Sequence, residues 1–153
     1  VIENVAGTAL DINDGNLTIT NSIVRQSTQG LWVRSSRTNI SANEIYSNDT
    51  GLVTGLRNHI TLLQNTIRDN AVGIKVVGPL GNLFFNQNNI EDNVEFDLSV
   101  FGSHDRSVTA YGNWWGTADK AVIESNIYHH PDDDLLSTVI FEPFAVEPVS
   151  TSP

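Results

Sequence analysis

The 153-residue sequence contains no cysteine and no methionine. Without cysteine, a disulfide framework and a thiolate metal site are excluded, although secretion is not. Because no methionine can serve as the initiator, we expect the chain to be a mature or excised segment. Its length is that of one ordinary domain, which can bury a core without disulfide or metal staples.

Basic residues and long apolar runs are also scarce. The chain has 8 Lys and Arg against 18 Asp and Glu, a formal net charge of −10. This charge argues against nucleic acid and anionic membrane surfaces as partners, because both would repel the protein. No stretch approaches the roughly 18 apolar residues of a membrane span. The first ten residues lack the basic start of a signal peptide, so we expect any targeting signal to lie upstream.

What the sequence does contain is a short motif, Asn-x-Ile, that returns at a nearly fixed interval. Its copies are Asn21-Ser22-Ile23, Asn43-Glu44-Ile45, Asn65-Thr66-Ile67 and Asn88-Asn89-Ile90, with Asn113-Trp114-Trp115 as a variant. The leading asparagines are 22, 22, 23 and 25 residues apart. Such a period indicates a solenoid, in which each repeat buries its apolar face only by stacking on the next. The chain is expected to begin in the middle of a coil.

Within each repeat, short alternating segments are separated by turn residues. Three residues after each anchor aliphatic comes a polar turn position, at Gln26, Asn48, Asn70 and Asn93. A glycine or aspartate follows, at Gly30, Gly51, Gly73 and Asp97, and an aliphatic residue comes directly after it. Alternation predicts short strands, and the many Asn and β-branched residues disfavour helix. In the first repeat Leu17 and Ile19 are one residue out of register, so we expect a local adjustment there.

Coils of about 22 residues with three strands each stack into a parallel β-helix, at about 4.8 Å per coil. Equivalent residues then form columns. We predict an internal aliphatic column of Ile23, Ile45, Ile67 and Ile90. Beside it we predict an inward amide ladder of Asn21, Asn43, Asn65, Asn88 and Asn113.

The repeats, with the pattern N-x-I, N and G-I-x-V, resemble right-handed parallel β-helix repeats of the pectate-lyase-like superfamily. The block from Gly112 to Thr117, with the segment that follows it, is similar to the closing coil of many bacterial and archaeal extracellular β-helix proteins. The resemblance covers Val1 to Phe144. It implies an all-β right-handed fold and a secreted, extracellular or cell-surface prokaryotic protein. It implies no activity, because this fold carries lyases, hydrolases, epimerases, adhesins and inert stalks.

The chain is expected to divide into a β-helix domain and a tail. Coils occupy residues 1–107, a capping coil occupies 108–144, and the Pro/Ser/Thr-rich residues 145–153 form a linker or tail. In the cap, Trp115 is predicted to plug the end of the aliphatic column, and residues 119–129 are predicted to form a short helix across it. A sugar-stacking platform is the alternative for the Trp114–Trp115 pair.

Two outer columns supply candidate site residues. Trp32, Arg34 and Lys75 can stack on and pair with an acidic sugar. Asp69 and Asp92 stand one coil apart, about 5 Å, where they can share a cation such as calcium. Ordinary solvated surface is the alternative for both groups. In the superfamily's lyases the resemblance implies acidic calcium ligands and a basic proton abstractor on one face, but we assign no catalytic residue and expect no cofactor other than this calcium.

The sequence therefore predicts a non-catalytic extracellular β-helix domain with a structural, adhesive or assembly role in a larger surface or secreted protein. The alternative is a polysaccharide-active enzyme (lyase, hydrolase or epimerase), or a carbohydrate-binding domain, acting on acidic glycans. Expected partners are a polysaccharide or copies of the chain stacked end to end, through the exposed edge of the first coil.

Overall fold

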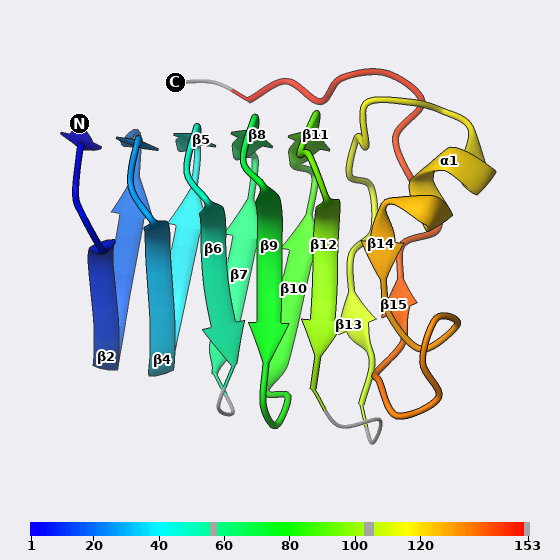
Figure 1. The fold of residues 1–153 in the computed structure, drawn as a ribbon, viewed down its shortest axis with the longest axis horizontal. Coiled ribbons are helices and arrows are strands. Elements are labelled where there is room, and N and C mark those ends of the chain that lie inside the picture. The colour runs from blue at the N-terminus through cyan, green and yellow to red at the C-terminus, as the bar shows by residue number, and fades with distance from the viewer. Residues whose placement is uncertain (56–57, 103–105, 152–153) are drawn as a thin grey trace.

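The computed structural model describes residues 1–55, 58–102 and 106–151, with the side chains of residues 35 and 36 left aside. It is an all-β, right-handed parallel β-helix of about five coils with one short helix (Figure 1). The predicted fold class is confirmed. None of the helices in the described part of the chain is long and apolar enough to cross a membrane.

Each coil contributes one strand to each of three faces. The short sheet contains β1 (Ile2–Glu3), β3 (Ile23–Arg25), β5 (Glu44–Tyr46), β8 (Thr66–Arg68) and β11 (Asn89–Glu91). The front face contains the first halves of β2 (Thr8–Thr20) and β4 (Gln29–Ser41), then β6 (Thr50–Gly55), β9 (Val72–Val77), β12 (Phe96–Phe101) and β14 (Ile127–Tyr128). The back face contains the second halves of β2 and β4, then β7 (His59–Leu63), β10 (Asn82–Asn86), β13 (Val108–Thr109) and β15 (Val139–Ile140).

The front and back faces belong to one ten-stranded sheet, because β2 and β4 run through the corner between them without a break. The first half of β4 pairs with β6 and its second half pairs with β7, all in parallel. In a later coil residues 78–81 separate β9 from β10, and Figure 1 shows this connection at the lower edge. The coils therefore keep their register on each face while the corner between the faces changes.

Aliphatic columns fill the interior. One column holds Val24, Ile45, Ile67 and Ile90, and Trp115 closes it; none of these side chains is more than 2% exposed. The bridge between Asn89 and Trp114 places Trp115 one coil beyond Ile90, as predicted for a plug. At about 25 cal/mol per Å² of buried apolar area, such columns are the main source of stability.

The amide ladder lies beside this column. The Nδ2 atoms of Asn43, Asn65 and Asn88 donate to the Oδ1 atom of the next asparagine, over 2.9, 3.0 and 3.0 Å, and Asn113 accepts the last bond. Each Nδ2 also donates to a backbone carbonyl of the preceding coil. All four residues are buried, so the ladder satisfies polar groups at the turn that the strands leave unpaired.

The predicted places of Asn21 and Ile23 in these columns are wrong. Ile23 pairs with Glu44, and Val24 pairs with Ile45, so the first coil is offset by one residue. The backbone N–H of Ser22 therefore donates to Asn43 Oδ1 (3.0 Å), while Asn21 is exposed at a positive φ of 51°. Asparagine tolerates this left-handed conformation better than most residues. Leu17 and Ile19, where an adjustment was expected, pair in regular register with β4.

The cap contains the predicted helix, but a shorter one. Helix α1 spans Lys120–Ser125, with Asp119 as its N-cap and Ile123 buried under it. The prediction of helix up to residue 129 is wrong, because Ile127 and Tyr128 pair with Leu98 and Ser99 as strand β14. The sheet hydrogen bonds of the preceding coil thus continue into the cap after the helix ends.

The segment that was predicted as a linker or tail turns back over the coils. In Figure 1 it leaves the cap and runs along the short sheet, past β11 and β8. The backbone N–H of Ala145 donates to Asn113 O over 2.9 Å at the start of this path.

Candidate functional site

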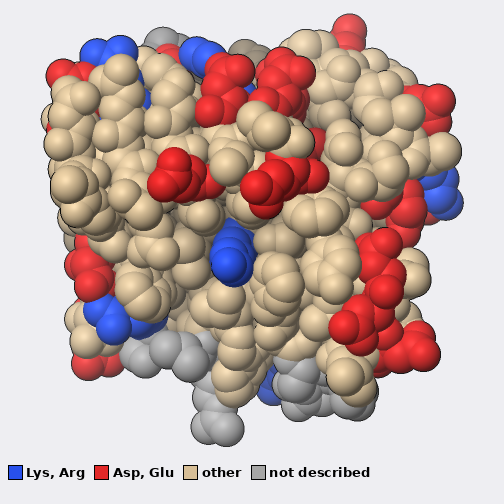
Figure 2. Space-filling view, viewed as in Figure 1, with Lys and Arg blue, Asp and Glu red and all other residues tan. Residues whose placement is uncertain are grey.

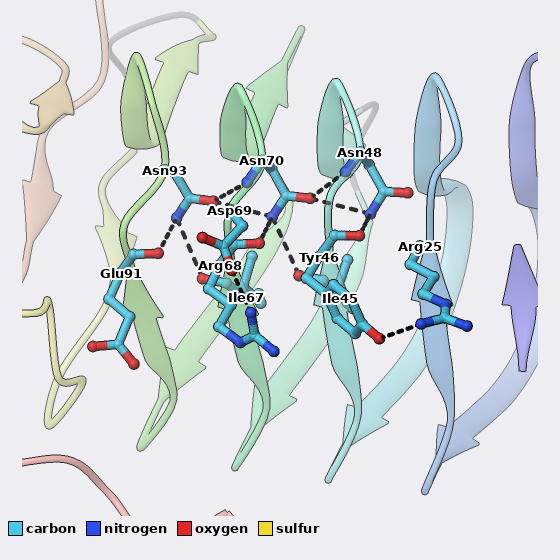
Figure 3. A network of polar contacts seen from close by, with 10 residues as sticks. All are labelled: Arg25, Ile45, Tyr46, Asn48, Ile67, Arg68, Asp69, Asn70, Glu91 and Asn93. Atoms are coloured by element: carbon cyan, nitrogen blue, oxygen red, sulfur yellow. Dashed lines mark hydrogen bonds and ion pairs between the residues drawn. The ribbon is translucent and has the colours of Figure 1, made fainter. Parts of the chain in front are cut away.

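A second inward amide ladder lies at the turn between the short sheet and the front face (Figure 3). Asn48 Nδ2 donates to Asn70 Oδ1 over 3.1 Å, and Asn70 Nδ2 donates to Asn93 Oδ1 over 3.0 Å. The sequence identified these residues only as polar turn positions. Their spacing, which equals that of the first ladder, is the signal that could have shown a second ladder.

The second ladder ends at a buried carboxyl group. Asn93 Nδ2 donates to Asp97 Oδ1 over 2.8 Å, and Asp97 is 2% exposed. Burial raises the pKa of Asp97 to about 7; hydrogen bonds from Asn93 oppose this rise, and the charges of Asp92 and Glu91 add to it. This is the largest electrostatic perturbation among the described residues, and it lies inside the coil next to the cap.

The three preceding coils have glycine where this coil has Asp97. A Cβ at Gly30, Gly51 or Gly73 would lie 2.5, 2.7 and 2.6 Å from the carbonyl oxygen of the next coil. Only a residue without a side chain fits such a close approach. Asp97 instead faces the cap, where its backbone N–H donates to Asn126 O over 2.9 Å.

On the front face, two of the three predicted ligand residues form one cluster. The guanidinium of Arg34 lies 4.5 Å from the centre of the Trp32 ring, and its Nη2 atom lies 2.5 Å from Asp11 Oδ2. The arginine therefore already has a carboxylate partner, which competes with any acidic ligand. All three side chains come from β2 and β4.

The third predicted ligand residue, Lys75, lies in a different setting. Its Nζ atom is 5.1 Å from the centre of the Phe101 ring, and no carboxylate pairs with it in the described part of the chain. In Figure 2 a basic patch lies near the middle of this face, amid uncharged surface, and acidic side chains lie above it. Lys75 is the only basic residue of β9.

The Phe101 ring beside this lysine is the first of three aromatic rings that contact one another in series toward the cap. The ring of Tyr128 lies 5.4 Å from that of Phe96 and 5.5 Å from that of Phe101, centre to centre. Ser99 pairs with Lys75 in the sheet, and its hydroxyl is buried without a hydrogen-bond partner among the described residues. Lysine, hydroxyl and three rings thus form one patch, which we call the Lys75 patch. The sequence pointed to the lysine but missed the rings, because they come from β12 and β14.

The two clusters share a face without touching. Trp32 pairs with Val53, and Val53 pairs with Lys75, so the clusters are two coils apart. Two strand spacings are about 10 Å. Val53 between them is 4% exposed, so the neighbouring side chains cover it.

The candidate cation ligands lie elsewhere, at the turn of Figure 3. Asp69 and Asp92 share a left-handed turn position with Gln26 and Ser47, and both aspartates are exposed. The Asp69 carboxylate forms an ion pair with Arg68 (Figure 3). No group of three or more potential metal ligands occurs among the described residues. Arg68 thus neutralises one of the two carboxylates in this arrangement.

The two tryptophans of the cap have separate structural contacts. Trp115 is 2% exposed inside the core, whereas Trp114 is half-buried and donates from Nε1 to Glu91 Oε2 over 2.8 Å. His129, in the same cap, lies with its Nε2 atom 2.8 Å from Glu124 Oε1 and accepts the N–H of Val139 at Nδ1. These side chains therefore tie the cap to the coils and to itself.

The family model for the right-handed beta helix region matches residues 1–115. The chain belongs to this family, which agrees with the register and ladders described above. No curated protein and no solved structure gives a match to the chain. Membership of the family defines the architecture, whereas function resides in the residues that the fold carries on its surface.

Proposed function

We propose that this chain is a non-catalytic β-helix domain with a structural, adhesive or assembly role, within a larger secreted or cell-surface protein. The observation that supports this most is the pair of amide ladders. Together with the aliphatic columns they fix each coil against the next at two turns. A scaffold of this kind holds rows of outward side chains about 4.8 Å apart on flat faces, as a stalk or adhesive surface requires.

The Lys75 patch supports a second candidate function, the binding of an acidic glycan. Aromatic rings stack on sugar rings, and an ammonium group without a carboxylate partner attracts a sugar carboxylate. A glycan extended along the axis of the coils would reach from this patch to the cluster of Trp32 and Arg34, two coils away. This candidate is compatible with an adhesive role.

Electrophoresis in native gels that contain polygalacturonate or alginate tests glycan binding. The wild-type protein should be retarded, and Lys75→Gln should lose about tenfold in affinity, because a charge-assisted hydrogen bond disappears. Lys120→Gln is the matched control, since it changes the net charge equally but lies on α1, paired with Glu142. Equal retardation of both variants would argue against the Lys75 patch as the binding site.

Incubation with the same polymers, with and without calcium, tests the non-catalytic proposal. Formation of unsaturated or shortened products would show a lyase or hydrolase and would overturn it. Calcium-dependent retardation without product would instead indicate calcium-assisted binding, for which Asp69 and Asp92 are the candidate ligands.

A further inference from the structure

The C-terminal segment 145–151, which we call the strap, is bound by the coils through its backbone. Asn89 Nδ2 donates to Val149 O over 2.9 Å, and Val149 N donates to Asn89 Oδ1 over 2.8 Å. One coil further on, the hydroxyls of Thr151 and Thr66 lie 3.1 Å apart. The strap therefore crosses the coils along their axis, as Figure 1 shows.

The Asn89 side chain acts here as a neighbouring strand would. It offers one acceptor and one donor to a single residue of the strap, and it is 7% exposed as a result. This recognition involves the main chain of the strap and depends little on its side chains. Residues 146–148, which connect Val149 to the cap, are all exposed. The strap is therefore held to its own copy at Ala145, Val149 and Thr151, and the exposed residues 146–148 form the tether between them.

The surface under the strap extends beyond it. Asn89 and Thr66 belong to one outward column of the short sheet, whose next members are Glu44 and Ile23. Beside Thr151, which itself lines it, lies a cavity whose other lining residues are Asn21, Ser22, Ile23, Ala42, Asn43 and Glu44. We call this continuous surface, from Asn89 to Ile23, the strap groove.

We infer that the strap groove is a binding site for an extended polypeptide, and that the strap of a second copy of this chain occupies it. An exchanged strap makes the same contacts with Asn89 and Thr66 as the strap of the same chain, so exchange loses no hydrogen bond. The competing local strap has an effective concentration in the millimolar range, as short flexible tethers give. Exchange between copies is therefore expected at high protein concentration, or where copies are held close together. It does not depend on glycan binding.

Disulfide trapping tests this exchange, because the natural chain contains no cysteine. The full-length variants Thr66→Cys and Thr151→Cys are mixed near millimolar concentration under mild oxidation. The expected product is a covalent dimer that contains one copy of each variant. Ser125→Cys replaces Thr66→Cys in the matched control, since residue 125 is exposed on α1, away from the groove. A yield no higher than that of this control would overturn the inference.

Two further variants make the test decisive. Adding Asn89→Ala to the Thr66→Cys chain removes both bonds to Val149 from that groove only, so a strap that leaves the intact groove of the Thr151→Cys chain loses them on exchange. The dimer yield should then fall about tenfold or more. An unchanged yield would overturn the inference. The double variant Thr66→Cys/Thr151→Cys should form an internal disulfide when dilute and increasing amounts of dimer when concentrated. An internal disulfide at every concentration would show a strap that does not exchange.

Discussion

Replacement of Asp97 with asparagine is expected to stabilise the protein at neutral and alkaline pH. The carboxyl group of Asp97 is buried at the end of the second ladder, and its pKa is raised from 3.8 to about 7. Its ionised form is therefore unfavourable in the folded protein. Asparagine has nearly the same shape, keeps an acceptor for Asn93 Nδ2 and carries no charge.

The size of the effect follows from the pKa. A shift of about three units at about 1.4 kcal/mol each means that ionised Asp97 destabilises the folded state by about 4 kcal/mol. Asparagine has one acceptor oxygen where the carboxylate has two, so the variant loses about 1 kcal/mol of hydrogen bonding. We expect a net gain of about 3 kcal/mol at pH 8, which corresponds to a melting temperature about 5 to 10 °C higher.

The gain depends on pH in a defined direction. The folded state binds the Asp97 proton more tightly than the unfolded state does, so the free energy of unfolding falls as the pH rises from about 4 to about 7. Below pH 4 the carboxyl is protonated in both states and the wild type has no such disadvantage. The variant should thus be no more stable than the wild type at pH 4 and more stable by about 3 kcal/mol at pH 8.

Urea unfolding of both proteins at several pH values between 4 and 9 measures this difference. Asp92→Asn is the matched control, because it removes the same charge at an exposed position of the same coil. A stability difference for Asp97→Asn that does not change with pH would refute the argument. So would an equal, pH-dependent gain for Asp92→Asn, which would point to net charge as the cause.

Two further substitutions test the packing of the coils by thermal unfolding. Asn65→Leu should destabilise by at least about 2 kcal/mol, because it leaves buried donors and acceptors of two neighbouring coils without partners. Asn39→Leu, at an exposed position, is the control and should change stability little. Equal effects of the two substitutions would argue against the ladder. Gly55→Ala should destabilise by about 1–3 kcal/mol or more, because a methyl group there would overlap the Val77 carbonyl. Gly7→Ala is the control and should be tolerated, because the space around Gly7 is open. A Gly55→Ala variant as stable as the wild type would show that the two coils can move apart.

Much of the fold could be predicted because residues that contact one another in successive coils of a solenoid recur in the sequence at the coil length. Ile45, Ile67 and Ile90 recur at the coil length, so alignment of the repeats gives the column directly. The prediction failed at Asn21 and Ile23 because the first coil is offset by one residue, which puts Val24 in the column in place of Ile23. Ile23 and Val24 are both aliphatic, so the sequence pattern does not reveal the offset.

The candidate site was less predictable, for a physical reason. Trp32, Arg34 and Lys75 could be placed on one face by period alone, but the partners that distinguish them could not. Asp11 neutralises Arg34, whereas Lys75 lies against the Phe101 ring and has no carboxylate partner among the described residues. The difference between the partners of Arg34 and Lys75 comes from side chains of neighbouring coils. The repeat period specifies where those residues lie but not which way their side chains point.

The sequence by itself determined the coil and the plug at Trp115, and it determined the aliphatic column from Ile45 onward and the first amide ladder from Asn43 onward, because each depends on residues that repeat at one interval. Only the tertiary structure decided what happens where the repeat is broken. The buried Asp97 owes its raised pKa to a coil that meets the cap instead of another coil, and the strap finds its partner Asn89 across 60 residues of sequence. Neither contact follows from a period, because burial and long-range pairing exist only once the coils are stacked.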